Sequence, residues 1–492
     1  AVIREGGIQD FGGPFMPWSK LLGVEWVRQQ AADRIGGMLS KVWFDGKVFW
    51  DFDPRKPGPF HDYTQGNMEM LLQVEYNLPT RRLEDKSYSP LKEVMTRAIR
   101  RRIEGVGPFV HFPAGLITVD GKVYLNNSFV RALPPAPDPV DLTGGEGRPF
   151  TFGTNFPWIR EFLVSSFPKR GSAAPLEYFL SWLKYAYANA HAQRPRRGQV
   201  VILNGQVETG KSLLIDLIVT PLLGGMDSTP GKAFSYATGS TGFNQDLFEK
   251  PVWSIDDEHV ESSREHDRYS NFLKTTAAWG VYRMEAKYRK AINVYWHGRL
   301  MVAMNADGTS SRLLPNADIS LSDKVMMFGF GGKKVVFPPR DQLGAILESE
   351  LPHFARWLLN WKIPPHCIGT SRFGVAVYHD PVLMRMAFES GSNFSFYELL
   401  REYLRQYRQR DFVLQNQMTC WRGSASLLHM EISETFPKTA SSFSARSIGA
   451  ALTDLMMRGL NIKRTRSAGE RVWEVPFDLR IDMEGPGEEG AD

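Results

Sequence analysis

One short segment of this 492-residue chain has the residue types and spacing of a phosphate-binding loop. It reads GQVETGKS from Gly205 to Ser212, which fits the pattern G-x-x-x-x-G-K-[ST]. The glycines let backbone N–H groups point at phosphate oxygens, Lys211 brings a positive charge to the β and γ phosphates, and the Ser212 hydroxyl is a ligand for Mg²⁺. A chance match on a tight turn is the alternative. The residues predicted to bind ATP are Gly205, Gln206, Val207, Glu208, Thr209, Gly210, Lys211, Ser212 and Leu213.

Three carboxylates follow at the end of an apolar run, FEKPVWSIDDE, from Phe248 to Glu258. A strand that ends in acids beside the phosphate loop can hold Mg²⁺ with one carboxylate and orient the attacking water with the next. We assign Asp256 to the metal and Asp257 to the water, with Glu258 as the other candidate for the water. An acidic surface loop is the alternative interpretation.

A polar amide ends the next apolar run, RLMVAM, from Arg299 to Met304. The amide belongs to Asn305. Because an amide both donates and accepts hydrogen bonds, Asn305 at this position would contact the γ-phosphate and the attacking water and act as a sensor of hydrolysis. An ordinary loop asparagine is the alternative.

A basic cluster containing one aromatic residue lies between the acids and Asn305, within Gly280 to Gly298. The pattern predicts a hairpin with this cluster at its tip. Cations there would contact phosphates, and the ring would stack on a base of single-stranded DNA. A solvated group of charges is the alternative. The candidate DNA contacts at the tip are Lys287, Tyr288, Arg289 and Lys290.

These side chains need a buried sheet to bring them together. The β-branched run from Val200 to Leu203 is typical of a strand buried on both faces, as in a parallel sheet, and an apolar helix is predicted from Leu213 to Thr220. Upstream, the aromatic-rich run from Pro175 to Gln193 has helical spacing and predicts a collar helix that packs on the core. The fold class expected for the centre of the chain is therefore α/β.

Composition limits the possible classes of protein. The hydrophobic fraction of 42% and the thirteen tryptophans indicate globular domains, and the net charge of +5 with a pI near 9.0 favours a polyanionic partner. Cys367 and Cys420 lie far apart and have no metal-ligand spacing, so neither a disulfide framework nor a zinc site is expected, and we predict a reducing, cytoplasmic location. No apolar run approaches the roughly 18 residues of a membrane span.

Turn-rich and charged segments divide the chain into six predicted regions. The N-terminal region contains two Asp-Gly hairpin signals, at Asp45-Gly46 and at Asp120-Gly121. The regions are an N-terminal α+β region (1–145), a helical collar (146–195), a P-loop ATPase core (196–340), a lid and connector (341–393), a winged-helix-like domain (394–480) and an acidic flexible tail (481–492).

The predicted winged helix is the second candidate DNA-binding surface. Residues 394–480 carry thirteen Lys/Arg against nine Asp/Glu, with a basic group in the second helix and in the hairpin. A winged helix used for protein contacts is the alternative. The basic residues in question are Arg446, Lys463, Arg464, Arg466 and Arg471.

Taken in order, GQVETGKS, PVWSIDDE, the basic MEAKYRK and MVAMNAD resemble the motifs of superfamily 3 helicases, the AAA+-like ring ATPases of viruses, phages and mobile elements. Phage primase-helicases look most similar. The resemblance covers about residues 175–380 and implies the roles given above for Lys211, Ser212, Asp256, Asp257 and Asn305. It also places the basic hairpin in the pore of a hexameric ring.

In many members of this family an arginine after the sensor strand stabilises charge in the neighbouring subunit's site. The corresponding stretch here, PNADISLSDKVMMFGF, offers Lys324, and Arg312 is the second candidate. A lysine lacks the planar fork of a guanidinium, so this sequence departs from the commoner pattern.

The resemblance implies an ATP-dependent replicative DNA helicase that moves 3′ to 5′ on one strand and acts on single-stranded and forked DNA, with a primase or polymerase as a further partner. In a phage it would work in the cytoplasm of the host cell. Two other functions compete with this prediction. One is a P-loop DNA motor or loader that does not unwind. The other is an origin-binding or assembly protein for which ATP is only a switch.

Overall fold

The structure is a computed structural model of the whole chain. It describes the following residues: 2–4, 7–9, 12–23, 25–26, 29, 41–52, 60–76, 90–137, 152–169, 174–256, 258–260, 262–278, 280–285, 291–306, 313–315, 323–331, 337–369, 372–389, 394–457, 460–467 and 470–479. The chain divides into two compact units, of which the first comprises 1–129 and 281–296 and the second comprises 130–280 and 297–492.

A parallel five-stranded sheet forms the centre of the second unit, in the order β11-β12-β15-β10-β16. Its middle strands are buried along almost their whole length, which is what the β-branched and apolar sequences predict. The strands are β10 (Val200–Gly205), β11 (Gly231–Lys232), β12 (Val252–Asp256), β15 (Arg299–Asn305) and β16 (Val325–Gly329). The α/β class predicted for this part of the chain is confirmed.

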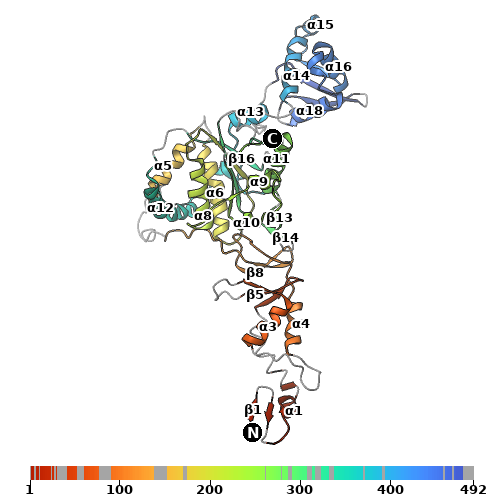
Figure 1. The fold of residues 1–492 in the computed structure, drawn as a ribbon. Helices are drawn as coiled ribbons and strands as arrows, with labels where there is room; N and C mark the ends of the chain where they lie inside the picture. The colour runs from red at the N-terminus through yellow and green to blue at the C-terminus, as the bar shows by residue number, and fades with distance from the viewer. Residues whose placement is uncertain are drawn as a thin grey trace, which may run out of the picture. The chain divides into compact units, whose positions relative to one another are not determined.

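Helices cover both faces of this sheet (Figure 1). Successive side chains of a strand point to opposite faces, so Val252 joins the large core beneath α5, α6, α8 and α12, whereas Trp253 stacks on Phe272 of α11 at 6.0 Å between ring centroids. The first face is covered by α5 (Pro157–Ser166), α6 (Pro175–His191), η2 (Leu214–Val219), α8 (Thr220–Gly224) and α12 (Arg340–Asn360). The second is covered by α9 (Phe234–Ala237), α10 (Gln245–Phe248) and α11 (Ser263–Ala278).

A buried carboxylate joins α12 to the start of α5. The two oxygens of Glu350 accept hydrogen bonds from the backbone N–H groups of Trp158 (3.1 Å) and Ile159 (2.9 Å). These N–H groups lie in the first turn of α5, where no neighbour within the helix can accept them and where negative charge is favourable. Glu350 therefore fixes the helix that carries Phe162, a ring packed against the predicted phosphate loop.

We expect Glu350→Ala to lower the free energy of unfolding by about 2 kcal/mol, because two buried N–H groups would lose a charged acceptor. In a unit of this size such a change lowers Tm by about 2–4 °C. Differential scanning fluorimetry measures the shift. Glu348→Ala on the exposed side of the same helix is the matched control and should leave Tm within about 1 °C; an equal loss in both variants would contradict this role of Glu350.

A connector follows α12 and leads through η5 (Pro365–Cys367) to α13 (Pro381–Glu389). It packs on α6, where Nε2 of His366 lies 2.9 Å from Oε2 of Glu177, and the ligand atoms of Glu177, His366 and Cys367 all lie within 4.8 Å of one another. The sequence did not predict this grouping. Burial raises the pKa of the Cys367 thiol to about 11, so at neutral pH it is a protonated, packed side chain.

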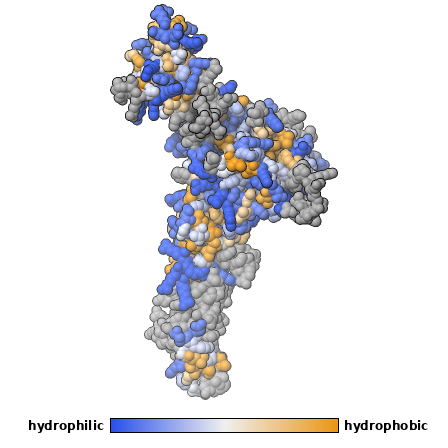
Figure 2. Space-filling model, turned by 180° about the vertical axis from the view of Figure 1, so that it is seen from behind, coloured by the Kyte–Doolittle hydropathy of each residue, from blue (hydrophilic) through white to orange (hydrophobic). Residues whose placement is uncertain are grey.

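The C-terminal part of the second unit, 394–479, combines helices with a small antiparallel sheet of order β17-β19-β18. Trp421, Tyr403 and Leu428 are buried in its core. On the face seen in Figure 2, hydrophilic residues predominate over this part. The elements are α14 (Phe394–Tyr407), α15 (Asp411–Gln415), β17 (Cys420–Gly423), α16 (Ala425–Thr435), α17 (Pro437–Ala440), α18 (Ala445–Met457), β18 (Lys463–Ser467) and β19 (Glu470–Pro476).

The first unit contains three small sheets, in the orders β1-β2-β3, β4-β5-β6 and β7-β9-β8, together with the hairpin β13-β14. Both predicted Asp-Gly hairpins form, at the turn between β4 and β5 and at the turn between β8 and β9. The elements are β1 (Val2–Arg4), β2 (Gly7–Gln9), β3 (Met16–Pro17), α1 (Trp18–Leu22), β4 (Val42–Phe44), β5 (Phe49–Phe52), β6 (Phe60–Tyr63), α3 (Gln65–Tyr76), α4 (Pro90–Arg100), β7 (Val106–Gly107), β8 (Gly115–Val119), β9 (Lys122–Asn126), β13 (Val281–Met284) and β14 (Ile292–Tyr295).

Candidate functional site

The predicted phosphate loop connects β10 to a helix that begins at α7 (Lys211–Leu213) and continues through η2 and α8. Two loop residues have left-handed backbone conformations, Glu208 with φ of 64° and Gly210 with φ of 89°. Such a path turns successive N–H groups to the inside of the loop. A Cβ at position 210 would lie 2.9 Å from the ring of Phe162 and 3.0 Å from that of Phe337, so glycine is required there for packing as well as for conformation.

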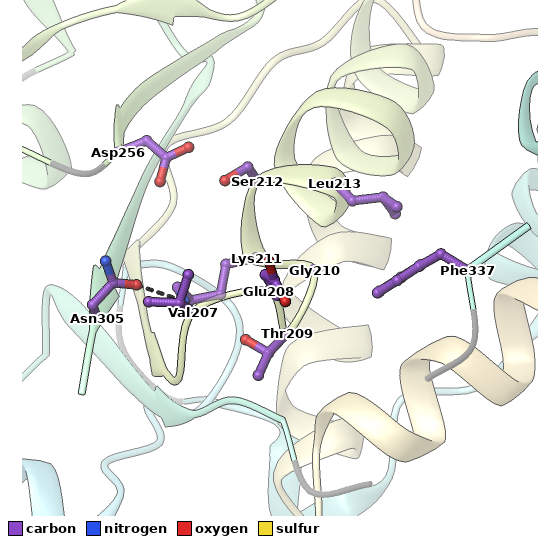
Figure 3. Close-up of a pocket in the computed structure, with 10 residues that line it drawn as sticks. All are labelled: Val207, Glu208, Thr209, Gly210, Lys211, Ser212, Leu213, Asp256, Asn305 and Phe337. Atoms are coloured by element: carbon purple, nitrogen blue, oxygen red, sulfur yellow. Dashed lines mark hydrogen bonds between the residues drawn. The ribbon is translucent and has the colours of Figure 1, made fainter. Parts of the chain in front are cut away.

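Lys211 lies beneath this loop and is almost fully buried. Its ammonium group donates hydrogen bonds to the carbonyl oxygens of Gly205 (3.0 Å) and Gln206 (2.8 Å) and to Oδ1 of Asn305 (3.1 Å), and Figure 3 shows the last of these. Asn305 itself ends β15, and its carbonyl accepts a hydrogen bond from the Asn204 amide (3.3 Å). The fold therefore brings the lysine and the amide, which are far apart in sequence, to the carboxyl ends of two neighbouring strands.

Asp256 ends β12 on the same edge of the sheet, and Figure 3 shows its carboxylate facing the Ser212 hydroxyl across the cavity. Oδ1 of Asp256 is buried and has no hydrogen-bond partner among the described residues. A buried carboxylate oxygen without a donor is costly unless a cation or water fills the space beside it. A carboxylate and a hydroxyl are oxygen ligands of the kind that Mg²⁺ prefers, so this pair fits that ion.

A cavity of about 410 Å³ joins these groups. Its polar end contains Lys211, Ser212, Asp256 and Asn305, and Leu213 and Phe337 line its other, apolar end (Figure 3). The sequence did not single out Phe337. The full lining is Val207, Glu208, Thr209, Gly210, Lys211, Ser212, Leu213, Asp256, Asn305 and Phe337.

A further carboxylate that the sequence reasoning missed is Asp216, in the π-helical segment η2. Burial raises its pKa, the charge of Lys232 opposes that shift, and the charge of Asp256 adds to it. Asp216 is therefore close enough to Asp256 for the two carboxylates to repel each other. Its spacing of four residues from Ser212 on one helix face was the available signal.

Several predicted residues lie away from this cavity. Glu258 lies beyond the end of β12, and its side chain is partly buried. Lys324 precedes β16, and its carbonyl accepts a hydrogen bond from Val200 N–H (2.9 Å) at the amino end of β10, the end opposite the cavity. The predicted residues that lie outside the described part are Asp257, Lys287, Tyr288, Arg289, Lys290 and Arg312.

The basic residues of the C-terminal part are exposed wherever their side chains are described. Arg446 is the second residue of α18, and the guanidinium carbon of Arg464 lies over the ring of Trp473, 5.8 Å from its centroid. The register pairs position 466 with 471 and position 464 with 473, so these positions share one face of the sheet, whereas Lys463 lies on the other face. The predicted basic group is thus split between the two faces.

Residues 203–315 match the model of a family described as a family of unknown function, DUF5906, which is less than half of the chain. A comparison with curated proteins finds no match. Among solved structures, the apo A form of the NrS-1 C-terminal region is similar over 90% of this chain and 98% of that chain, with a TM-score of 0.52 and 14% identity. This likeness is one of fold.

A second solved structure, described as the active helicase SCCmec type IV Cch, covers 83% of this chain and 70% of its own, with a TM-score of 0.28 and 11% identity. At that score the likeness carries no structural argument. Among the described residues, no helix is both long and apolar enough to cross a membrane.

Proposed function

We propose that this chain is an ATP-dependent DNA helicase of the superfamily 3 type, serving replication of a phage or mobile element. The observation that carries the proposal is the meeting of Lys211, Ser212, Asp256 and Asn305 around one cavity at the carboxyl edge of a parallel sheet. Open α/β sheets bind ligands at that edge. The order of the motifs along the sequence, which resembles superfamily 3, supports the same function.

In this proposal the loop N–H groups and Lys211 would hold the β and γ phosphates, and Ser212 and Asp256 would hold Mg²⁺, an ion that neutralises charge on phosphates. Asn305 receives the Lys211 hydrogen bond in the present structure and would exchange it for the γ-phosphate. Asp257 orients the attacking water, with Glu258 as the alternative. Lys324, whose backbone lies at the sheet edge opposite its own chain's cavity, would serve the site of a neighbouring subunit in a hexameric ring, and Arg312 is the second candidate.

Two DNA contacts complete the proposal. The tip of the β13-β14 hairpin would grip one strand, and 394–479 would act as a winged helix that binds duplex DNA through Arg446, Arg464 and Arg471. The antiparallel sheet beside α16 and α18 supports that assignment. A primase or polymerase would supply the other activities of the replication complex.

The decisive experiment measures ATP turnover with and without single-stranded DNA, and strand separation on a forked duplex. We expect single-stranded DNA to stimulate turnover at least about fivefold and the fork to be unwound only with ATP and Mg²⁺. Stimulated turnover without unwinding would favour a DNA motor or loader. Tight ATP binding with no stimulated turnover would favour an ATP switch, and either result would overturn the helicase proposal.

We expect Lys287→Ala to spare basal ATP turnover and to reduce unwinding at least about tenfold, because it removes a phosphate contact from the DNA-gripping tip and leaves the nucleotide cavity intact. A fork-unwinding assay beside an ATPase assay measures both quantities. Arg283→Ala, on β13 of the same hairpin, is the matched control because Arg283 is already paired with Glu285 (2.9 Å). Equal losses of turnover and unwinding in Lys287→Ala would contradict the separation of roles.

A further inference from the structure

The hairpin that carries the basic tip is too small to be stable alone. Each strand, β13 and β14, has four residues, and an isolated two-stranded hairpin is at best marginally stable in water. Yet Tyr282, Met284, Val294 and Tyr295 are all buried. Although the hairpin is inserted between α11 and β15 of the ATPase core, it belongs to the same compact unit as residues 1–129.

Two glycines, Gly105 and Gly107, let the backbone at β7 lie close to the hairpin. A Cβ at Gly105 would lie 2.7 Å from Cγ2 of Ile292, and a Cβ at Gly107 would lie 2.8 Å from Cδ1 of Ile292 and 3.1 Å from Cγ1 of Val294. Real Cβ atoms do not come so close to other carbons. The backbone beside β7 therefore lies directly against the side chains of β14.

Tyr295 makes a polar contact in this interface. Its hydroxyl donates a hydrogen bond to Oδ2 of Asp120 (2.7 Å), in the turn between β8 and β9. Its ring packs on Phe109 at 6.3 Å and edge-on to Tyr124 at 6.2 Å between centroids. Burial, and then the hydrogen bond to Asp120, raise the pKa of Tyr295 to about 12, so the hydroxyl remains a donor at neutral pH.

The aromatic side of the interface is itself held rigidly. Asn126, at the end of β9, is fully buried, and its amide accepts from Phe109 N–H (2.9 Å) and donates to the carbonyls of Phe109, Phe112 and Pro113 (3.0, 3.1 and 2.9 Å). One side chain thus makes hydrogen bonds with three residues of the segment that presents Phe109 to Tyr295. A satisfied buried network of this kind makes a segment rigid.

We propose that residues 101–129 are the mechanical support of the basic hairpin, so that β7, β8, β9 and the hairpin move as one rigid body during the ATP cycle. Tyr295 and Asp120 are positioning residues that hold the tip through this body. The inference gives the N-terminal region a role that the sequence left open. Only the binding of DNA by the tip rests on the proposed function. The contacts that would hold the hairpin rigid lie within this chain.

A disulfide staple tests whether the two parts stay together. The Cβ at position 105 would lie 3.4 Å from Cβ of Ile292, close to the range of about 3.5–4.5 Å that disulfides require. We would introduce Gly105→Cys and Ile292→Cys in a Cys420→Ser background, because Cys420 is partly exposed and Cys367 is buried. The rate of disulfide formation is then measured at a fixed concentration of oxidised glutathione, which is reduced to the thiol as the protein disulfide forms. The full-length protein is tested without nucleotide, with ADP, and with a non-hydrolysable ATP analogue plus single-stranded DNA.

A rigid body predicts that the rates in these states agree within about twofold, whether or not the protein proves to be a helicase. A rate that changes tenfold or more with nucleotide or DNA would show that the hairpin leaves its support and would overturn the inference. If the protein unwinds DNA, the oxidised staple should also retain at least about half of the unwinding rate of the reduced form. Loss of unwinding on oxidation that a reductant restores would likewise overturn it.

A second pair of variants tests Tyr295 and Asp120 with a readout that simple destabilisation does not change. We expect Tyr295→Phe and Asp120→Ala each to raise the number of ATP molecules hydrolysed per base pair unwound at least about twofold, with unchanged KM for ATP. Because both remove the same hydrogen bond, the double variant should be no worse than the more affected single variant. An unchanged ratio in both variants would show that this bond does not position the tip.

Discussion

Lys211→Ala is expected to reduce ATP turnover at least about 100-fold while leaving the affinity for single-stranded DNA within about twofold. Lys211 is buried at the polar end of the cavity, and its ammonium group is the cation that joins the loop carbonyls to Asn305. A fixed cation at the transferring phosphate acts mainly on the transition state, and removing such a group typically costs a factor of 10²–10³. Steady-state turnover and fluorescence anisotropy with labelled DNA measure the two quantities.

Lys184→Ala is the matched control for that variant. Lys184 is also partly buried and donates to two backbone carbonyls, those of Leu358 (2.7 Å) and Leu359 (2.8 Å), but it lies on α6 and not on the cavity lining. It should lower thermal stability and keep turnover within about threefold of the unmodified protein. If Lys184→Ala lost as much ATP turnover as Lys211→Ala, both losses would reflect general destabilisation. That result would contradict the proposed role of Lys211 at the nucleotide.

Asp256→Asn is expected to lose at least about 100-fold in Mg²⁺-dependent turnover and to bind nucleotide in EDTA as well as the unmodified protein does. The carboxylate faces Ser212, and its Oδ1 is buried without a hydrogen-bond partner among the described residues, so the charge has no other evident function there. An amide keeps the shape of the side chain and weakens metal binding. Turnover over a range of Mg²⁺ concentrations, and binding of a fluorescent ATP analogue with and without EDTA, separate metal binding from nucleotide binding.

The control for this substitution is Asp246→Asn, an exposed acid in the first turn of α10. This substitution makes the same change of charge away from the cavity and should leave the Mg²⁺ dependence of ATP turnover unaltered. A normal Mg²⁺ titration in Asp256→Asn, with full turnover at millimolar metal, would show that another group binds the ion. Asp216 would then be the first candidate, because its carboxylate lies close enough to Asp256 for their charges to interact.

The parts of the site that lie in one continuous segment were predicted from the sequence. Gly205, Gly210, Lys211 and Ser212 are near neighbours, so their spacing alone fixes a strand, a loop and a helix start. The ends of β12 and β15 were also predicted, because each is an apolar run followed by a polar side chain. The acid-bearing strand is shorter than its apolar run suggests, since Phe248 ends α10 and β12 begins only at Val252.

Features that depend on contacts between distant segments were not predicted. Phe337 lines the cavity although it follows β16 in the chain, and Glu350 contacts the start of α5 although it lies 192 residues after Trp158. Neither residue lies in a recognisable local pattern. The sheet order places β15 between β10 and β12, which no local periodicity specifies. Lys463 and Arg464 lie on opposite faces of the sheet because of the strand register. A count of basic residues in the segment cannot detect this separation.

The insertion of 281–296 into the N-terminal unit has a consequence for the evolution of the chain. A domain whose residues are contiguous can be lost, exchanged or fused elsewhere at a single genetic breakpoint. Here a cut near residue 130 would leave Val294 and Tyr295 on the downstream fragment without the partners that bury them, and would expose apolar side chains prone to aggregation. The two compact units are therefore expected to be inherited together, and recombination between relatives should preserve matching sequences of β7 and β14.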